Sequence, residues 1–181
     1  MACFFGDGAS NEGSFHESLN IAGAFALPVV YICENNLYGV GTRHENVSGV
    51  REIASRAASY GMPGISVDGN DALAVFESAQ QAVERARRGE GPSLIECKTY
   101  RWSTHFEGEP DTYRPPEEVK QWLAHEPLGI YRQKMQEMGI VSPEEMDRIE
   151  AAVIKELDEA VEFARNSKFP EPEEALEDLW A

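Results

Sequence analysis

The sequence predicts an α/β fold: a doubly wound, mainly parallel sheet followed by a helical extension at the carboxyl end. Over the first hundred residues, short apolar runs typical of buried strands alternate with segments of helical periodicity. Beyond residue 116 only helical patterns remain. We therefore expect two domains, an α/β domain over residues 1–116 and a helical extension over residues 117–181.

The first three elements form a strand, a helix and a second strand. Residues 2–5 are wholly apolar, which predicts a strand buried on both faces of a parallel sheet. A helix is expected over residues 11–26, with Ser10 or Asn11 as its N-cap, and the β-branched run at residues 29–33 predicts the next strand. Such a unit of roughly 30 residues makes two parallel strands joined by a right-handed crossover.

The same alternation continues to residue 100. Four further elements are expected: a short helix over 52–60, a strand within 64–69, a helix from Asp71 to about Arg88, and a strand over 92–100. Asp71 is suited to cap the longer helix, and Gly89 follows it as the C′ residue.

The last third of the chain begins with a long loop over residues 100–116 and continues as helices. Helices are expected over 117–124 and 128–138, and a third opens at Ser142 with a capping box completed by Glu145. One face of this third helix is apolar, formed by Met146, Ile149, Val153, Leu157 and Val161. An intramolecular core and a subunit contact both remain open as its partner.

Composition limits the classes of function. The 181 residues include 16 basic and 32 acidic side chains, and the net charge of −16 disfavours binding to nucleic acid or to an anionic membrane. Three cysteines without CxxC spacing, and no signal peptide or membrane span, lead us to expect a cytoplasmic protein with reduced thiols. Since the first strand begins almost at Met1, the chain is expected to start in mid-fold.

Two polar residues are expected to meet at one edge of the sheet. Asp7 ends the first strand and Asn36 follows the second, and ligands of parallel α/β sheets bind at the carboxyl ends of strands. A carboxylate, an amide oxygen and a backbone carbonyl suit Mg²⁺ or Ca²⁺, and a diphosphate commonly completes such a site. Gly6 and Gly8 let the backbone approach this ligand, and the helix start near Ala9 offers N–H groups to it.

These residues resemble a known family. Gly6-Asp7-Gly8 followed by Glu34-Asn35-Asn36 resembles the thiamine diphosphate motif. The stretch "GDGASNEGSFHESLNIAGAFALPVVYICENNLYGVGT" is similar to the α subunit of the E1 component of 2-oxo acid dehydrogenase complexes, and so is "YRWSTHFEGEPDTYRPPEE". The resemblance implies the thiamine diphosphate-binding fold, with this chain as the carboxyl-terminal half of a family α subunit.

The resemblance also implies the site residues. Those expected to bind thiamine diphosphate are Gly6, Asp7, Gly8, Ala9, Asn36, Tyr38 and His105. Among them, Asp7, Asn36 and the carbonyl of Tyr38 would bind Mg²⁺. His105 is implied to be the catalytic residue, a proton donor that helps to transfer the acyl group to a lipoyl sulfur.

The implied function is that of part of a pyruvate or acetoin dehydrogenase. It would act on a small 2-oxo acid or on acetoin within an α2β2 heterotetramer with an E1 β subunit, and it would pass the acyl group to lipoamide on the E2 acyltransferase. Phe106 stands where some family members carry a phosphorylated serine, so regulation by a kinase there is not expected.

Two other hypotheses stay open. Family α chains are nearly twice as long, so the chain could be a truncated, non-catalytic fragment that at most binds subunits or Mg²⁺-diphosphate. It could also be the cofactor-binding chain of a split transketolase-like enzyme, although that class does not predict the loop "YRWSTHFEGEPDTYR".

Overall fold

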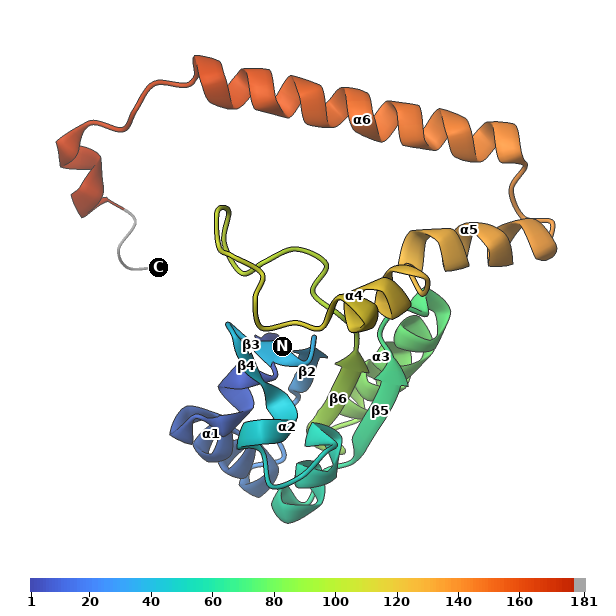
Figure 1. Ribbon diagram of the computed structural model, residues 1–181. Helices are drawn as coiled ribbons and strands as arrows, with labels where there is room; N and C mark the ends of the chain where they lie inside the picture. The colour runs from blue at the N-terminus through green and yellow to red at the C-terminus, as the bar shows by residue number, and fades with distance from the viewer. Residues whose placement is uncertain (178–181) are drawn as a thin grey trace. The chain divides into compact units, whose positions relative to one another are not determined.

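The structure is a computed structural model in which residues 1–177 are described (Figure 1). The chain divides into two compact units, Met1–Tyr131 and a second that begins at Arg132. The first contains the sheet and the candidate site, and the second is helical. Each unit is described by itself. The expected domain boundary between residues 116 and 117 stays a prediction.

A four-stranded parallel sheet forms the centre of the first unit. Its strands, in spatial order, are β1 (Ala2–Gly6), β2 (Val30–Asn35), β6 (Ser93–Lys98) and β5 (Gly64–Asp68). All four lie where the apolar runs predict strands, and the α/β fold class is confirmed. Because every pairing is parallel, all four carboxyl ends lie at the same edge of the sheet.

Helices cover both faces of the sheet (Figure 1). On one face, α1 (Gly13–Ala24) and the 3₁₀ helix η2 (Ile53–Tyr60) pack on a core that includes Leu19, Cys33, Ile53 and Leu94. On the other face, α3 (Ala72–Arg87) packs against a smaller core that includes Val30, Ala82, Ile95 and Cys97. The helix at 52–60 was expected, but it is a 3₁₀ helix.

The expectation that the first strand is buried on both faces is wrong for one face. Burial alternates along β1, and the side chain of Phe4 is 63% exposed while Cys3 and Phe5 pack against the α1 core. Phe4 pairs in register with Ile32, which packs on the α3 side of the sheet. In the described residues α3 packs mainly on β5, β6 and β2, and Phe4, on the neighbouring strand, stays mostly exposed.

The start of the first helix also differs from the prediction. A short 3₁₀ turn, η1 (Gly8–Asn11), precedes α1, whose N-cap is Glu12 without a side-chain cap bond. Ser10, one of the two predicted caps, instead donates its hydroxyl to the carbonyl oxygen of Asp7 at 2.7 Å. The hydroxyl therefore fixes the turn after β1 rather than capping α1.

Other predicted helix ends are confirmed. The carboxylate of Asp71 accepts hydrogen bonds from the backbone N–H groups of Leu73 and Ala74, and Gly89 has a left-handed φ of 73° after the end of α3. In the second unit, the Ser142 hydroxyl accepts a bond from the Glu145 N–H at 3.2 Å and caps α6 (Pro143–Asn166). The described residues do not show the returning bond from the Glu145 side chain that the predicted capping box requires.

The remaining elements are short and lie around the carboxyl edge or in the extension. They are β3 (Tyr38–Gly39), β4 (Thr42–Arg43), α2 (His44–Val47), α4 (Pro116–Leu123), α5 (Pro127–Glu137) and η3 (Pro172–Leu176). The antiparallel β3–β4 hairpin was not predicted, because two-residue strands leave no periodic pattern. Within the described part of the chain, no helix has the length and apolar character needed to cross a membrane.

Gly64 tests the tight packing of η2 on the sheet. A Cβ at this position would lie 1.9 Å from the carbonyl oxygen of Ala54, whereas one at Gly49 would meet nothing within 4 Å. We expect Gly64→Ala to lower the free energy of unfolding by about 1–3 kcal/mol, because the backbone at Ala54 must move to make room for the added Cβ. Gly49→Ala is the matched control. Equal urea denaturation midpoints for the two variants would contradict this packing.

Candidate functional site

Asp7 is a buried carboxylate with an unused oxygen. It directly follows β1, is 1% exposed, and its Oδ2 has no hydrogen-bond partner among the described residues. Burial raises the pKa of Asp7, an effect opposed in part by His44 and by backbone N–H groups, including that of Asn36. Nδ1 of His44 lies 4.0 Å from this oxygen. An unpartnered buried carboxylate costs free energy unless a cation or a donor reaches it.

The turn after β2 brings Asn36 and Tyr38 beside Asp7. The amide oxygen of Asn36 accepts a bond from the Tyr38 N–H at 3.2 Å, and Leu37 between them has a left-handed φ of 74°. The next residue, Gly39, lies against Gly8: a Cβ on either would come within 3.2 Å of the other's Cα. Both glycines therefore allow the two turns to approach each other closely. The sequence predicted a different role for Gly8, which was to let the backbone approach a ligand.

The side chain of Asn35, the last residue of β2, fixes this turn by hydrogen bonds. Its side-chain amide donates to Oε1 of Glu96 at 2.7 Å, and its own amide oxygen accepts the Leu37 N–H at 3.1 Å. Glu96 is fully buried and also accepts the Ala54 N–H at 2.9 Å. Sequence reasoning missed Glu96, since one acidic residue inside an apolar strand gives no sign of its partner.

Arg56 holds the turn after β1. Its guanidinium donates to the carbonyl oxygen of Ser10, to the amide oxygen of Asn11 at 3.1 Å, and to the hydroxyl of Ser48 at 2.8 Å. The segment that follows Asp7 is thereby attached to η2. No sequence signal pointed to this arginine.

Glu118 of α4 gathers three donors near Tyr38. Its Oε1 accepts the hydroxyl groups of Tyr38 at 2.8 Å and of Tyr100 at 2.9 Å, and its Oε2 contacts Nη1 of Arg43. Burial alone would raise the pKa of Glu118, but these hydrogen bonds and the arginine charge outweigh it and hold the pKa below its ordinary value.

His105 lies exposed in the loop between β6 and α4. Its backbone N–H donates to Oε2 of Glu109 at 2.8 Å, and that oxygen also accepts the Tyr113 hydroxyl at 3.1 Å. The imidazole Nδ1 is 3.4 Å from Nη1 of Arg101. The loop thus has an internal polar network that presents His105 on its surface. That His105 and Asp7 belong to one common site stays a prediction.

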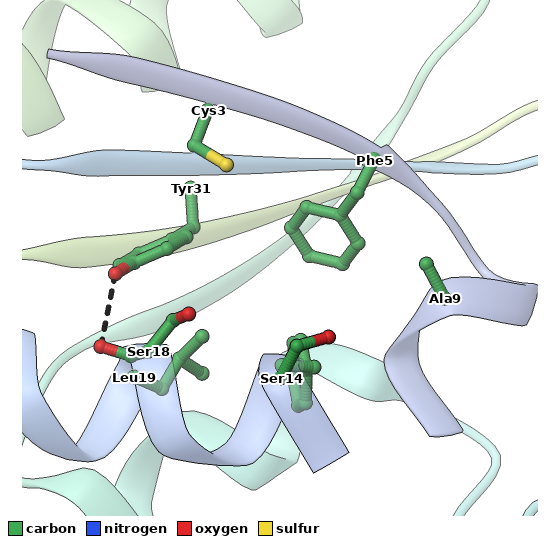
Figure 2. A pocket seen from close by; sticks show the side chains of 8 residues that line it. Cys3, Phe5, Ala9, Ser14, Ser18, Leu19 and Tyr31 are labelled. Carbon is green, nitrogen blue, oxygen red and sulfur yellow. Dashed lines mark hydrogen bonds between the residues drawn. The ribbon is translucent and has the colours of Figure 1, made fainter. Parts of the chain in front are cut away.

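Cavities lie on the α1 face of the sheet and beside the turn after β2 in the described part of the chain. One of about 140 Å³ sits between β1 and α1, and Figure 2 shows its side chains, including Cys3, Phe5 and Tyr31, whose hydroxyl donates to the Ser18 carbonyl. Its lining is mostly apolar and does not suit a diphosphate. The other, about 190 Å³, is lined mainly by residues with polar or charged side chains, including Asn35, Arg43, His44, Arg51 and Lys98.

The oxygen donors beside Asp7 are of the kind that a hard cation accepts. They include the Asp7 carboxylate oxygen without a partner and the amide oxygen of Asn36, which are ligand types that Mg²⁺ accepts. The imidazole of His44, 4.0 Å from the carboxylate, adds a nitrogen donor beside them. Among residues 1–177 no group of three or more His, Cys, Asp or Glu side chains could hold a metal. A site for zinc or iron made of such side chains is therefore absent from the described part.

A parallel α/β domain with an oxygen-rich turn pair at its carboxyl edge is the class of protein that the geometry defines. Comparison with known families is more specific: the family described as dehydrogenase E1 component matches residues 1–173. The chain belongs to this dehydrogenase E1 family.

Named relatives agree with this assignment. The α subunit of acetoin:2,6-dichlorophenolindophenol oxidoreductase of Bacillus subtilis is 46% identical over 178 residues, covering 98% of this chain and 53% of the relative. The pyruvate dehydrogenase E1 α subunit of Porphyra purpurea is 43% identical over 94% of this chain and 49% of its own length. The 2-oxoisovalerate dehydrogenase α subunit of Bacillus subtilis is 41% identical. The chain spans about half the length of the relatives it matches.

The two neighbouring asparagines are expected to differ in their effect on stability. Asn35→Ala removes the bond to a fully buried carboxylate, and leaving that group short of a donor costs about 1–3 kcal/mol of unfolding free energy. Asn36→Ala is the matched control and should cost less, because only a backbone N–H loses its partner. Urea denaturation measures both, and a larger loss for Asn36→Ala would contradict the role of Glu96.

Proposed function

We propose that this chain is the carboxyl-terminal part of an E1 α subunit and binds Mg²⁺ and thiamine diphosphate at the edge beside Asp7. The observation that carries the proposal is the buried, unpartnered Oδ2 of Asp7, next to the Asn36 turn, in a chain of the dehydrogenase E1 family. A cation at this oxygen would offset the cost of burying the carboxylate.

Each residue at the edge has a proposed task. The Asp7 carboxylate, the Asn36 amide oxygen and the Tyr38 carbonyl would hold Mg²⁺, and the backbone of Gly6, Gly8 and Ala9 would contact the diphosphate. When bound, thiamine diphosphate supplies the electron sink for cleaving the bond next to the substrate carbonyl. The chain's own part is to bind and orient the cofactor.

His105 is proposed as the proton donor in acyl transfer. It is exposed on a loop whose network joins Arg101, Glu109 and Tyr113, so its ring is available to a partner that approaches the site. A histidine can give or take a proton near neutral pH, which suits transfer to a lipoyl sulfur.

The proposed setting is a cytoplasmic α2β2 heterotetramer with an E1 β subunit, acting with the lipoyl acyltransferase E2. Pyruvate, acetoin and a branched 2-oxo acid are all candidate substrates, because relatives named for each of these enzymes share 41–46% identity with the chain. The alternative is a non-catalytic fragment that binds subunits or Mg²⁺-diphosphate without turnover. The alternative rests on the chain spanning about half of its relatives.

Asp7→Asn should have opposite effects on binding and on stability. It should abolish Mg²⁺-dependent binding of thiamine diphosphate, measured by calorimetric titration of the chain alone and with a candidate E1 β subunit. Because the pKa of Asp7 is raised in the fold, its charge destabilises the metal-free chain at neutral pH. We expect the metal-free variant to have a free energy of unfolding higher by on the order of 1 kcal/mol, measured by urea denaturation at neutral pH.

The wild-type chain is the control for that titration. Saturable Mg²⁺-dependent binding that Asp7→Asn retains would contradict the metal assignment. Absence of binding by the wild type, both alone and with the β subunit, would overturn cofactor binding altogether.

His105→Gln should slow the acyl-transfer step rather than cofactor binding. Loss of a positioned proton donor typically costs about 10²–10⁴-fold in rate. Reductive acylation of lipoyl domains by the assembled complex measures the step, and calorimetry measures the cofactor. If both fall equally, His105 is a structural residue of its loop.

A further inference from the structure

Glu118 connects three segments that are distant in the sequence. It lies on α4, yet its carboxylate accepts hydrogen bonds from Tyr38 at 2.8 Å and Tyr100 at 2.9 Å and pairs with Arg43. Arg43 Nη1 also donates to the Tyr38 hydroxyl at 3.0 Å. The ring of Tyr38 is therefore held at its hydroxyl by two charged groups of opposite sign. Hydrogen bonds to charged groups are stronger than neutral ones.

Tyr38 needs such a hold because its turn has an unusual backbone. Leu37 and Val40, on either side of the short strand β3, have φ values of 74° and 55°. A non-glycine residue in the left-handed region is strained and persists only where its surroundings fix it. The Tyr38 side chain is buried at 3% exposure and ends on Glu118, so this carboxylate fixes the turn through its side chain.

The loop that carries His105 reaches the same turn. Arg101 donates to the carbonyl oxygen of Val40 at 2.7 Å and to the Tyr113 hydroxyl at 2.7 Å. The Tyr113 ring lies 5.8 Å from the ring of Tyr38, centroid to centroid. The loop begins at Tyr100, whose hydroxyl is on Glu118 and whose ring stacks on Trp122 of α4 at 5.5 Å.

We propose that Glu118 is a positioning residue that fixes the Tyr38 carbonyl for the metal and ties the His105 loop to the same turn. The inference rests on the proposed function for the metal role of Tyr38, while the mechanical link rests on the contacts alone. One carboxylate would thus set the position of a metal-binding carbonyl and of the loop presenting the proton donor. Neither role follows from the sequence, where Glu118 reads as an exposed residue of a helix's first turn.

The first test is hydrogen exchange of the chain without cofactor. Glu118→Ala should speed amide exchange in two separate segments, residues 37–43 and 100–114, while exchange in β5 and α3 stays unchanged. Glu117→Ala, the exposed neighbour on α4, is the matched control and should change neither segment. Unchanged exchange in Glu118→Ala, or faster exchange in only one of the two segments, would overturn the link.

The second test is cofactor affinity with Mg²⁺. We expect Glu118→Ala to lower the affinity for thiamine diphosphate at least tenfold. Tyr38→Phe should lower it less, because Arg43 and the rest of the turn remain. Glu117→Ala should leave the affinity unchanged. Glu118→Gln keeps an acceptor for both tyrosines but loses the charge facing Arg43, and should fall between Glu118→Ala and wild type. If Glu118→Ala does not fold, Glu118→Gln and Tyr38→Phe carry both measurements.

The outcomes separate this inference from the proposed function. Wild-type binding that Glu118→Ala retains at full affinity would overturn the positioning role while leaving the metal site intact. If the wild type does not bind cofactor, the proposed function fails and the role at the metal falls with it. The exchange measurement then still decides whether Glu118 joins the two segments.

Discussion

Parallel pairing of β1 with β2 is the constraint on which the site depends. It places Gly6 opposite Glu34, so the residues that follow the two strands, Asp7 and Asn36, leave the sheet at the same edge. The two turns then approach until Gly8 and Gly39 leave no room for side chains between them. The backbone pairing therefore sets where the residues proposed to bind the metal stand, and their side chains act from those positions.

A second layer of buried polar contacts then holds those turns. Glu96 accepts hydrogen bonds from Asn35 and from the η2 backbone, Arg56 donates to the turn after Asp7, and Glu118 accepts the Tyr38 hydroxyl. Each of these holding groups is charged and at least partly buried, and each is satisfied by hydrogen bonds. The Oδ2 atom of Asp7, by contrast, has no hydrogen-bond partner among the described residues, and neither do the two ring nitrogens of His44 beside it or the Nε atom of Arg101. A buried carboxylate left unsatisfied in this way indicates a place for a ligand.

Local patterns were enough to predict the fold and the edge of the sheet, but not the contacts that hold the site. The apolar runs at β1, β2, β5 and β6, together with the caps at Asp71 and Ser142, follow from period and turn chemistry. The exposure of Phe4 could not be predicted, since it depends on how far α3 extends over the sheet. Ser10 was mistaken for a helix cap because a hydroxyl that caps and one that closes a turn look alike in sequence. Glu96, Arg56 and Glu118 act over separations of 42 to 80 residues, for which a single sequence carries no signal.

The central claim is that the edge beside Asp7 is a cation site. A direct test is anomalous diffraction from crystals of the chain bound to the candidate E1 β subunit, Mn²⁺ and thiamine diphosphate. Our account predicts one anomalous peak at ligand distance, about 2.0–2.2 Å, from the Asp7 carboxylate, the Asn36 amide oxygen and the Tyr38 carbonyl. Cofactor-bound crystals in which the manganese peak lies on other residues, with Asp7 making no contact to it, would contradict the account.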